Sequence, residues 1–188
     1  LDHGFCSVEA DIWLAPEGLL VAHDRKDLKP KRTLQSLYLD PLRKLVETNG
    51  GSVFAEGPSF YLLVDVKTEA ESTYKALDAV LAQYADILTA TKNGKVDRKA
   101  VTVILSGNRA FETIAKQPVH FVGIDGRPEN LDANPPADLY PWISANWTLL
   151  FKWKGEGPFP TAEKEKLRAM VQQTHGQHRK LRFWATAE

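Results

Sequence analysis

Two acidic residues lie two positions apart near the start of the chain, in the segment Val8-Glu9-Ala10-Asp11. The run 7–14 alternates polar and apolar side chains, which predicts a strand with Glu9 and Asp11 on the same face. Two like charges on a partly buried face are costly unless a counter-charge neutralises them. A hard divalent cation, Mg²⁺ or Ca²⁺, would do so because both ions prefer carboxylate oxygens. The alternative is an exposed edge strand with two solvated acids.

An acid and a lysine end a second apolar segment, Leu62-Leu63-Val64-Asp65-Val66-Lys67. Asp65 and Lys67 share one face of the predicted strand. Asp65 would supply a third oxygen ligand, and Lys67 would stabilise the negative charge that develops on phosphate oxygens. The alternative is a local ion pair beside the following helix.

His23 and Asp24 follow a short apolar arm, residues 19–22. A histidine exchanges protons near neutral pH, so His23 is a candidate general acid or base, although a lone histidine is more often structural. Three more side chains follow predicted strands and would either bind substrate or pack the rim of the sheet: Asn108, Asn146 and Trp184.

Strands and helices alternate along the chain. Further short apolar runs typical of buried parallel strands are 60–66, 101–105, 119–124, 142–145 and 181–185. Helices are predicted at 40–49, 68–84, 109–116 and 161–176, with loops at 125–140 and 152–160. The helix at 68–84 starts with the capping-box spacing of Thr68 and Glu71.

This alternation predicts an α/β protein with a parallel sheet. A TIM (β/α)8-type barrel typically needs about 250 residues. The chain is therefore expected to be one incomplete barrel domain over residues 1–188, without its first and last strands. An open doubly wound sheet is the rival, but it would usually carry a glycine-rich turn after its first strand.

Composition limits the partners. The 188 residues include 24 acidic and 24 basic side chains, so the formal net charge is zero and nucleic acid is not an expected partner. Cys6 is the only cysteine, which excludes an intramolecular disulfide. No apolar run approaches the roughly 20 residues of a membrane-spanning helix. Both ends read as cuts through a larger fold, so a targeting segment would lie upstream and no compartment is assigned.

The ordered combination of Val8-Glu9-Ala10-Asp11, His23-Asp24 and Asp65-Val66-Lys67 resembles the phospholipase C-like phosphodiesterase superfamily. The closer resemblance is to a bacterial and fungal branch related to altered-inheritance-of-mitochondria proteins. In that branch, Ser106-Gly107-Asn108 and Arg182-Phe183-Trp184-Ala185 are also familiar. The resemblance spans nearly the whole chain.

The resemblance implies an eight-stranded barrel with a divalent metal in its mouth. Glu9, Asp11 and Asp65 match acidic metal positions, and Lys67 matches the lysine two residues after the third of them. His23 matches one of two catalytic histidines, and the other is expected upstream of the chain. The implied reaction is metal-dependent hydrolysis of a small-molecule or lipid-headgroup phosphodiester, such as a glycerophosphodiester or a phosphoinositide.

Two other functions compete with this one. A degenerate barrel would bind a phosphorylated ligand or a protein partner without catalysis, because a fold does not guarantee chemistry. A barrel amidohydrolase would hold its metal with several histidines, and the five histidines here lack suitable spacing. Unpaired barrel edges favour association, so a homo-oligomer is a further expectation.

Overall fold

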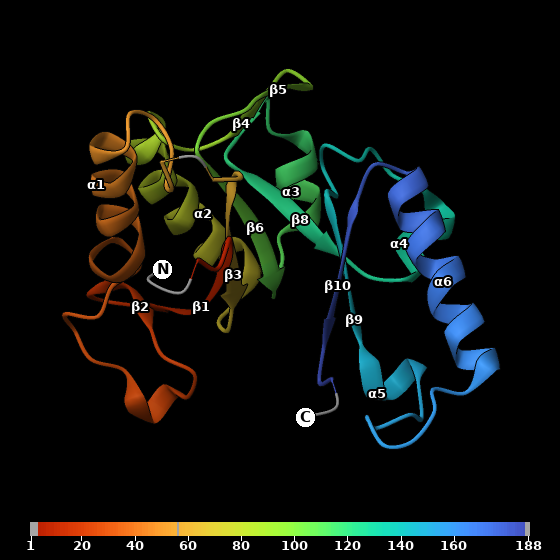
Figure 1. The fold of residues 1–188 in the computed structure, drawn as a ribbon. Helices are drawn as coiled ribbons and strands as arrows, with labels where there is room; N and C mark the ends of the chain where they lie inside the picture. Colours follow the sequence, from red (N-terminus) through yellow and green to blue (C-terminus); the bar gives the residue numbers. More distant parts are fainter. Residues whose placement is uncertain (1–3, 56, 187–188) are drawn as a thin grey trace. The chain divides into compact units, whose positions relative to one another are not determined.

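Strand β1 (Ser7–Ala15) lies one strand from the edge of the sheet that carries the acidic residues (Figure 1). The computed structural model describes residues 4–55 and 57–186, and the chain divides into two units, Leu1–Gly123 and Ile124–Glu188. In the first unit, β1 pairs in parallel with β3 (Phe60–Val66) and antiparallel with β2 (Gly18–Val21). On the other side of β3, β6 (Val101–Gly107) continues the parallel sheet. Both β3 and β6 are largely buried, as expected for central strands covered on two faces.

Helical segments connect these strands. They are η1 (Arg25–Asp27), a π-helical segment η2 (Gln35–Leu39), α1 (Asp40–Thr48), α2 (Ala70–Leu81), η3 (Ala82–Tyr84) and α3 (Phe111–Lys116). Because η2 runs directly into α1, the helix predicted at 40–49 starts about five residues earlier than expected. Asp40 therefore lies inside the helical run, where its carboxylate accepts a 2.6 Å hydrogen bond from the Tyr84 hydroxyl. Burial and this bond raise the pKa of Tyr84 to about 12.

A small three-stranded sheet in the first unit was not predicted. It contains β4 (Ala90–Lys92), β5 (Lys95–Asp97) and β7 (Val119–His120), in the order β5-β4-β7. Asn93 and Gly94 form the turn between β4 and β5 with φ angles of 50° and 75°. The apolar run predicted at 119–124 is thus divided between β7 and the separate strand β8 (Val122–Gly126).

The second unit is built on three parallel strands. Strand β8 crosses the boundary into it and pairs with β9 (Trp142–Asn146), which pairs with β10 (Lys180–Trp184). The connections contain α4 (Glu129–Ala133), α5 (Trp147–Leu150) and α6 (Thr161–Gly176). Helix α4 interrupts the segment predicted as a loop at 125–140. In the part of the chain that the structure describes, no helix has the length and apolar character needed to cross a membrane.

The prediction of a TIM barrel is wrong. Such a barrel closes eight parallel strands, each followed by a helix. Here β2 turns back antiparallel to β1 and ends the sheet of the first unit, and β10 ends the sheet of the second. The described residues form six α-helices, three of them with six residues or fewer. The fold is an open, mixed α/β sheet, and alternation along the sequence could not reveal it because alternation does not report closure.

The N-terminus of α2 is capped by Glu69 rather than by the predicted Thr68. One carboxylate oxygen of Glu69 accepts the Glu71 amide (2.9 Å), and the other accepts the Ser72 amide (2.8 Å) and hydroxyl (2.6 Å). Thr68 does not cap because its hydroxyl accepts the amide of Leu14 on β1 (2.9 Å). The Ser72 hydroxyl and the two amides lower the pKa of Glu69 to about 2, because they stabilise the ionised cap.

This cap gives an expected pH dependence of stability. A carboxyl whose folded pKa lies below its unfolded value stabilises the fold above the unfolded value, and the contribution is lost as the pH falls. The difference in melting temperature between wild type and Glu69→Gln should therefore be full near pH 6 and should decline between pH 4.5 and about 2. Thermal unfolding followed by circular dichroism at several pH values would measure it. The exposed Glu165→Gln on α6 is the control, and a difference that does not change with pH would contradict the capping role.

Candidate metal and phosphate site

Three carboxylates gather where β1 and β3 run side by side. Asp11 and Asp65 are Cα partners in the parallel register, so their side chains leave the same face of the sheet. Glu9 lies two residues before Asp11 and projects from that face as well. One carboxylate oxygen from each residue lies within 4.8 Å of the others. The opposite face of β1 carries the buried Ala10 and Ile12, as the alternating pattern predicted.

This donor set fits a hard divalent cation. Two oxygens bound to one Ca²⁺ at roughly 2.4 Å each can be at most about 4.8 Å apart, so the three oxygens are close enough to share an ion. Glu9 is exposed, whereas Asp11 and Asp65 are partly buried, so an ion could reach the carboxylates from solvent.

Lys67 balances part of the negative charge of these carboxylates. Its ammonium lies 2.6 Å from an Asp65 oxygen and 3.2 Å from an Asp11 oxygen. Burial alone would lower the pKa of Lys67, but its hydrogen bonds and charge attraction with Asp65 and Asp11 outweigh burial and raise it. Lys67 therefore stays protonated at neutral pH, and a fixed positive charge lies beside the oxygens.

The hairpin of β1 and β2 brings His23 to the same place. The residue before it is anchored twice: the Ala22 amide donates to the Asp11 carbonyl (3.2 Å), and the Trp13 indole donates to the Ala22 carbonyl (2.8 Å). The Nδ1 atom of His23 lies 2.8 Å from the second carboxylate oxygen of Asp11, while 85% of its side chain is exposed. Asp11 thus orients an imidazole ring that solvent, or a ligand, can reach.

Tyr38 is a neighbour of the carboxylates that the sequence analysis missed. Its hydroxyl donates to the backbone carbonyl of Glu9 (3.2 Å). Burial and the negative charge of Asp11 raise the pKa of Tyr38, and Arg32 opposes them, so the phenol stays neutral. No sequence spacing indicated that Tyr38 would lie beside the carboxylates, because it is 29 residues from Glu9 and belongs to an irregular helical segment.

Gly107 is the last residue of β6, and together with Asn108, which follows the strand, it holds the ends of the strands together. The Asn108 amide side chain donates to the Thr68 carbonyl (2.8 Å), just after β3. Gly107 has a φ of 68°, and a Cβ atom built on it would lie 2.1 Å from an Asp65 carboxylate oxygen. Only glycine leaves room for that carboxylate. In this structure the Asn108 side chain packs the rim, and a role in binding substrate stays a prediction.

Asn146 and Trp184 belong to the second unit and are partners in the register of β9 and β10. The Asn146 side chain caps α5, because its oxygen accepts the Thr148 amide (2.9 Å) and hydroxyl (2.8 Å). Trp184 is 45% exposed. The substrate-binding role predicted for both residues likewise stays a prediction.

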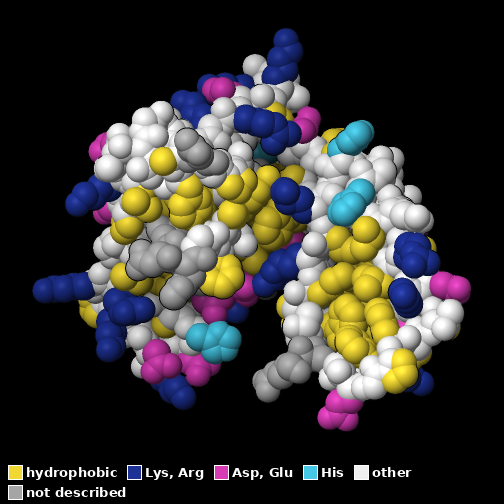
Figure 2. All heavy atoms as spheres, viewed as in Figure 1, with side chains coloured by type: hydrophobic (Ala, Val, Ile, Leu, Met, Phe, Trp, Pro, Cys, Tyr) yellow, Lys and Arg dark blue, Asp and Glu magenta, His cyan; other side chains and the backbone are white. Residues whose placement is uncertain are grey.

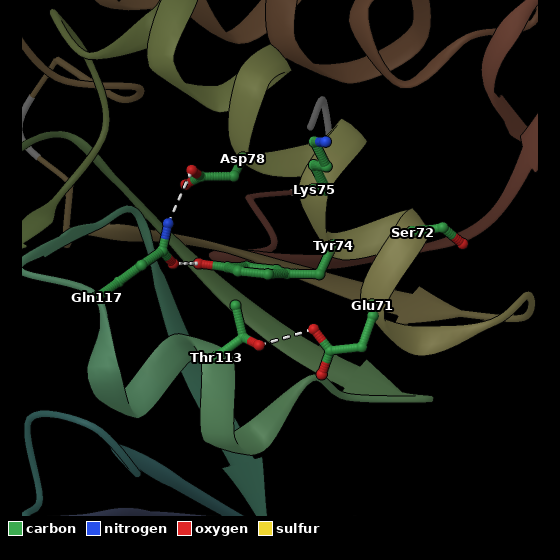
Figure 3. A pocket seen from close by; sticks show the side chains of 7 residues that line it. All are labelled: Glu71, Ser72, Tyr74, Lys75, Asp78, Thr113 and Gln117. Carbon is green, nitrogen blue, oxygen red and sulfur yellow. Dashed lines mark hydrogen bonds between the residues drawn. The ribbon is translucent and has the colours of Figure 1, made fainter.

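A cavity of about 350 Å³ between α2 and α3 is not lined by any of these residues (Figure 3). The Tyr74 hydroxyl donates to the Gln117 side-chain oxygen, the Gln117 amide donates to Asp78 (3.0 Å), and the Thr113 hydroxyl donates to Glu71 (2.7 Å). Because these polar groups satisfy one another, the cavity is a structural junction between the two helices.

Comparison with known proteins matches a family model to the part of the chain that contains the carboxylate cluster. The family model of the AIM6-like phosphodiesterase domain matches residues 1–121, which include every residue of the carboxylate cluster. The "Altered inheritance of mitochondria protein 6 homolog" of Arthroderma benhamiae is 27% identical over 212 residues, covering 99% of this chain and 65% of that protein.

Two shorter matches agree with this. "Altered inheritance of mitochondria protein 6" of Eremothecium gossypii is 36% identical over 130 residues, covering 57% of this chain and 32% of that protein. The Candida glabrata protein of the same name is 29% identical over 147 residues, covering 57% of this chain and 35% of that protein. The matched part of this chain thus covers 65% of the Arthroderma benhamiae protein and about one third of the other two relatives. No solved structure matches the chain. Since the family model covers more than half of its length, the chain belongs to the AIM6-like phosphodiesterase domain family.

Proposed function

We propose that this chain carries the metal- and phosphate-binding part of an active site that hydrolyses a phosphodiester. The observation that supports it is the convergence of three carboxylates and one ammonium on a single face of β1 and β3. Glu9, Asp11 and Asp65 would hold Mg²⁺ or Ca²⁺. When bound, such an ion neutralises charge on a phosphoryl oxygen and lowers the pKa of a bound water or alcohol.

The side chains of the chain would divide the remaining work. Lys67 places a fixed positive charge beside the carboxylates, where it would stabilise charge on the phosphate oxygens. His23 exposes its ring and is oriented through Nδ1 by Asp11, so its Nε2 atom would give or take the proton of an alcohol or water. The general acid–base partner of His23 would come from the upstream histidine that the family resemblance implies.

The proposed substrates are small or lipid-headgroup phosphodiesters whose alcohol is of the glycerol or inositol type. A phosphodiester carries one negative charge, which suits a site where one ammonium and one divalent ion face three carboxylates. The three positive charges of the ammonium and the divalent ion match those of the three carboxylates, so the ion-loaded site is neutral and does not repel a monoanionic substrate.

Direct ion binding is the sharpest test of this site. Mn²⁺, a spin probe that replaces Mg²⁺, should bind the wild-type chain. Asp11→Asn and Asp65→Asn should each lower the Mn²⁺ affinity by at least about tenfold, because mutating even a hydrogen-bond partner of a metal ligand typically causes a loss of that size. Electron paramagnetic resonance of free Mn²⁺ measures the binding. Glu17→Gln, in the exposed turn between β1 and β2, is the matched control.

Activity is measured with bis(4-nitrophenyl) phosphate on the same proteins. Hydrolysis should require Mg²⁺ or Ca²⁺ and should fall with the two aspartate variants but not with Glu17→Gln. If Mn²⁺ binds all four proteins equally, the carboxylates hold no ion and Lys67 is their resident counter-charge. That result would favour a phosphate-binding module without metal chemistry.

A further inference from the structure

The second unit contains a cavity of about 640 Å³, which is within the size range of ligand sites in proteins. Its walls come from the segment that follows β9, chiefly Trp147, Phe151 and Trp153, and from Ala185 and Thr186 just after β10. The cavity therefore lies beyond the carboxyl ends of two parallel strands, which is where open α/β sheets bind ligands.

The aromatic walls are held in place before any ligand arrives. The Trp147 indole donates to the Trp153 carbonyl (2.9 Å), and the Trp153 ring stacks on Phe159 with a centroid distance of 4.8 Å. Glu163 on α6 fixes the same loop, because its two carboxylate oxygens accept the amides of Lys152 (3.0 Å) and Trp153 (3.1 Å). A wall tied to a helix in this way loses little freedom on binding, which favours affinity.

The rim of the cavity is positively charged. Lys152 and Lys154 line the cavity, and both side chains are exposed. Among the residues that the structure describes, neither lysine has a salt-bridge partner. Glu156 is the single acidic residue in the lining, and Glu163 is already engaged with backbone amides. The two ammonium groups are therefore available to an anion.

Apolar surface continues outside the cavity. Leu149 follows the lining residue Thr148 and is 82% exposed, and Trp184 precedes the lining residue Ala185 and is 45% exposed. Figure 2 shows hydrophobic side chains gathered on this face of the second unit, between β10 and α6. The part of a long apolar ligand that extends beyond the cavity would therefore still contact apolar protein surface.

We propose that this cavity binds a single-chain anionic amphiphile. Its alkyl or acyl chain would lie along Trp147, Phe151 and Trp153, and its phosphate or phosphodiester group would meet Lys152 and Lys154. A nucleotide fits less well because the indole N–H groups of Trp147 and Trp153 both donate to backbone carbonyls and offer nothing to a base edge. The inference concerns binding alone and does not depend on the proposed hydrolysis.

Isothermal titration of the full chain with dodecyl phosphate, kept below its critical micelle concentration, tests the proposal. Binding with one-to-one stoichiometry is expected. The double variant Lys152→Ala/Lys154→Ala should raise the Kd about tenfold, as expected for two exposed charge contacts of modest strength. The variant Lys164→Ala/Arg168→Ala removes two exposed cations from α6 that do not line the cavity and should leave the Kd unchanged.

Comparison ligands separate the roles of chain and charge. Inorganic phosphate and dodecyltrimethylammonium should both bind at least about tenfold more weakly, since each lacks one half of the recognition. Trp153→Ala, checked for folding by near-ultraviolet circular dichroism, should weaken dodecyl phosphate as well. The proposal fails if wild type does not bind dodecyl phosphate, if the two double variants bind it equally, or if adenosine monophosphate binds more tightly.

Discussion

Lys67→Met is expected to lower phosphodiester hydrolysis by about 100-fold and, at the same time, to tighten the binding of Mg²⁺. The loss of activity follows because removing one preorganised group that faces developing negative charge typically costs about 100- to 1000-fold. The gain in affinity follows because Lys67 is hydrogen-bonded to Asp65 and ion-paired with Asp11, so its charge opposes an incoming cation. At the dielectric constant of water, a unit and a divalent charge about 5 Å apart repel by roughly 1.7 kcal/mol, or somewhat more than tenfold in affinity.

The same variant should be less stable than wild type without metal, by roughly 1–2 kcal/mol, because three carboxylates then face one another without their counter-charge. Added Mg²⁺ should raise its melting temperature more than it raises that of wild type. Differential scanning fluorimetry with and without Mg²⁺ measures this, and Lys44→Met on the exposed face of α1 is the control. Equal Mg²⁺ shifts in Lys67→Met and wild type would show that Lys67 and the ion do not share these carboxylates.

Gly107→Ala is expected to destabilise the first unit by about 3 kcal/mol and to abolish most of the activity. The added Cβ would lie 2.1 Å from an Asp65 oxygen and 2.4 Å from the Val66 carbonyl oxygen, and the second of these belongs to a buried strand that cannot move aside. A residue with a side chain in this left-handed conformation costs about 1 kcal/mol or more, and overpacking costs typically 1–3 kcal/mol in addition. Asp65 would be displaced from Asp11, and the cluster would open.

Gly94→Ala is the matched control for this prediction. Gly94 has a similar φ of 75°, but a Cβ atom built on it meets nothing within 4 Å. It should lose only the roughly 1 kcal/mol that the backbone conformation costs. Urea unfolding of both variants, with hydrolysis of bis(4-nitrophenyl) phosphate as the second readout, separates strain from collision. Equal losses of stability in the two variants would contradict the steric role assigned to Gly107.

The proximity of the acidic residues could be reasoned from the sequence because it depends on local rules. Residues two apart on a strand share a face, so Glu9 and Asp11 had to project together. A parallel strand that ends in Asp65-Val66-Lys67 had to bring its own polar end to the same edge of the sheet. The hairpin turn at residues 16–18 then returned the chain so that His23 met Asp11. The strand faces and the hairpin need only a few neighbouring residues, whereas the pairing of Asp11 with Asp65 follows from the expectation of a parallel sheet.

Features that depend on distant contacts were not accessible in the same way. Closure of the sheet is a property of all strands together, and the barrel prediction failed on that point. Tyr38 reaches Glu9 through tertiary packing, and no spacing in the sequence announces it. The hairpin of β4 and β5 is different, because Asn93-Gly94 between short polar strands is a strong local turn signal that was overlooked.

The ammonium among the carboxylates also bears on the order in which the protein matures. Many small metalloproteins stay unfolded until their ion arrives, because the free energy of ion binding supplies much of their folding free energy. Here Lys67 already pairs with two of the three acids, so the polypeptide can reach its native conformation before the proposed ion binds. If the proposed ion is needed for activity, a shortage of it during biosynthesis would delay activity without lowering the yield of folded protein.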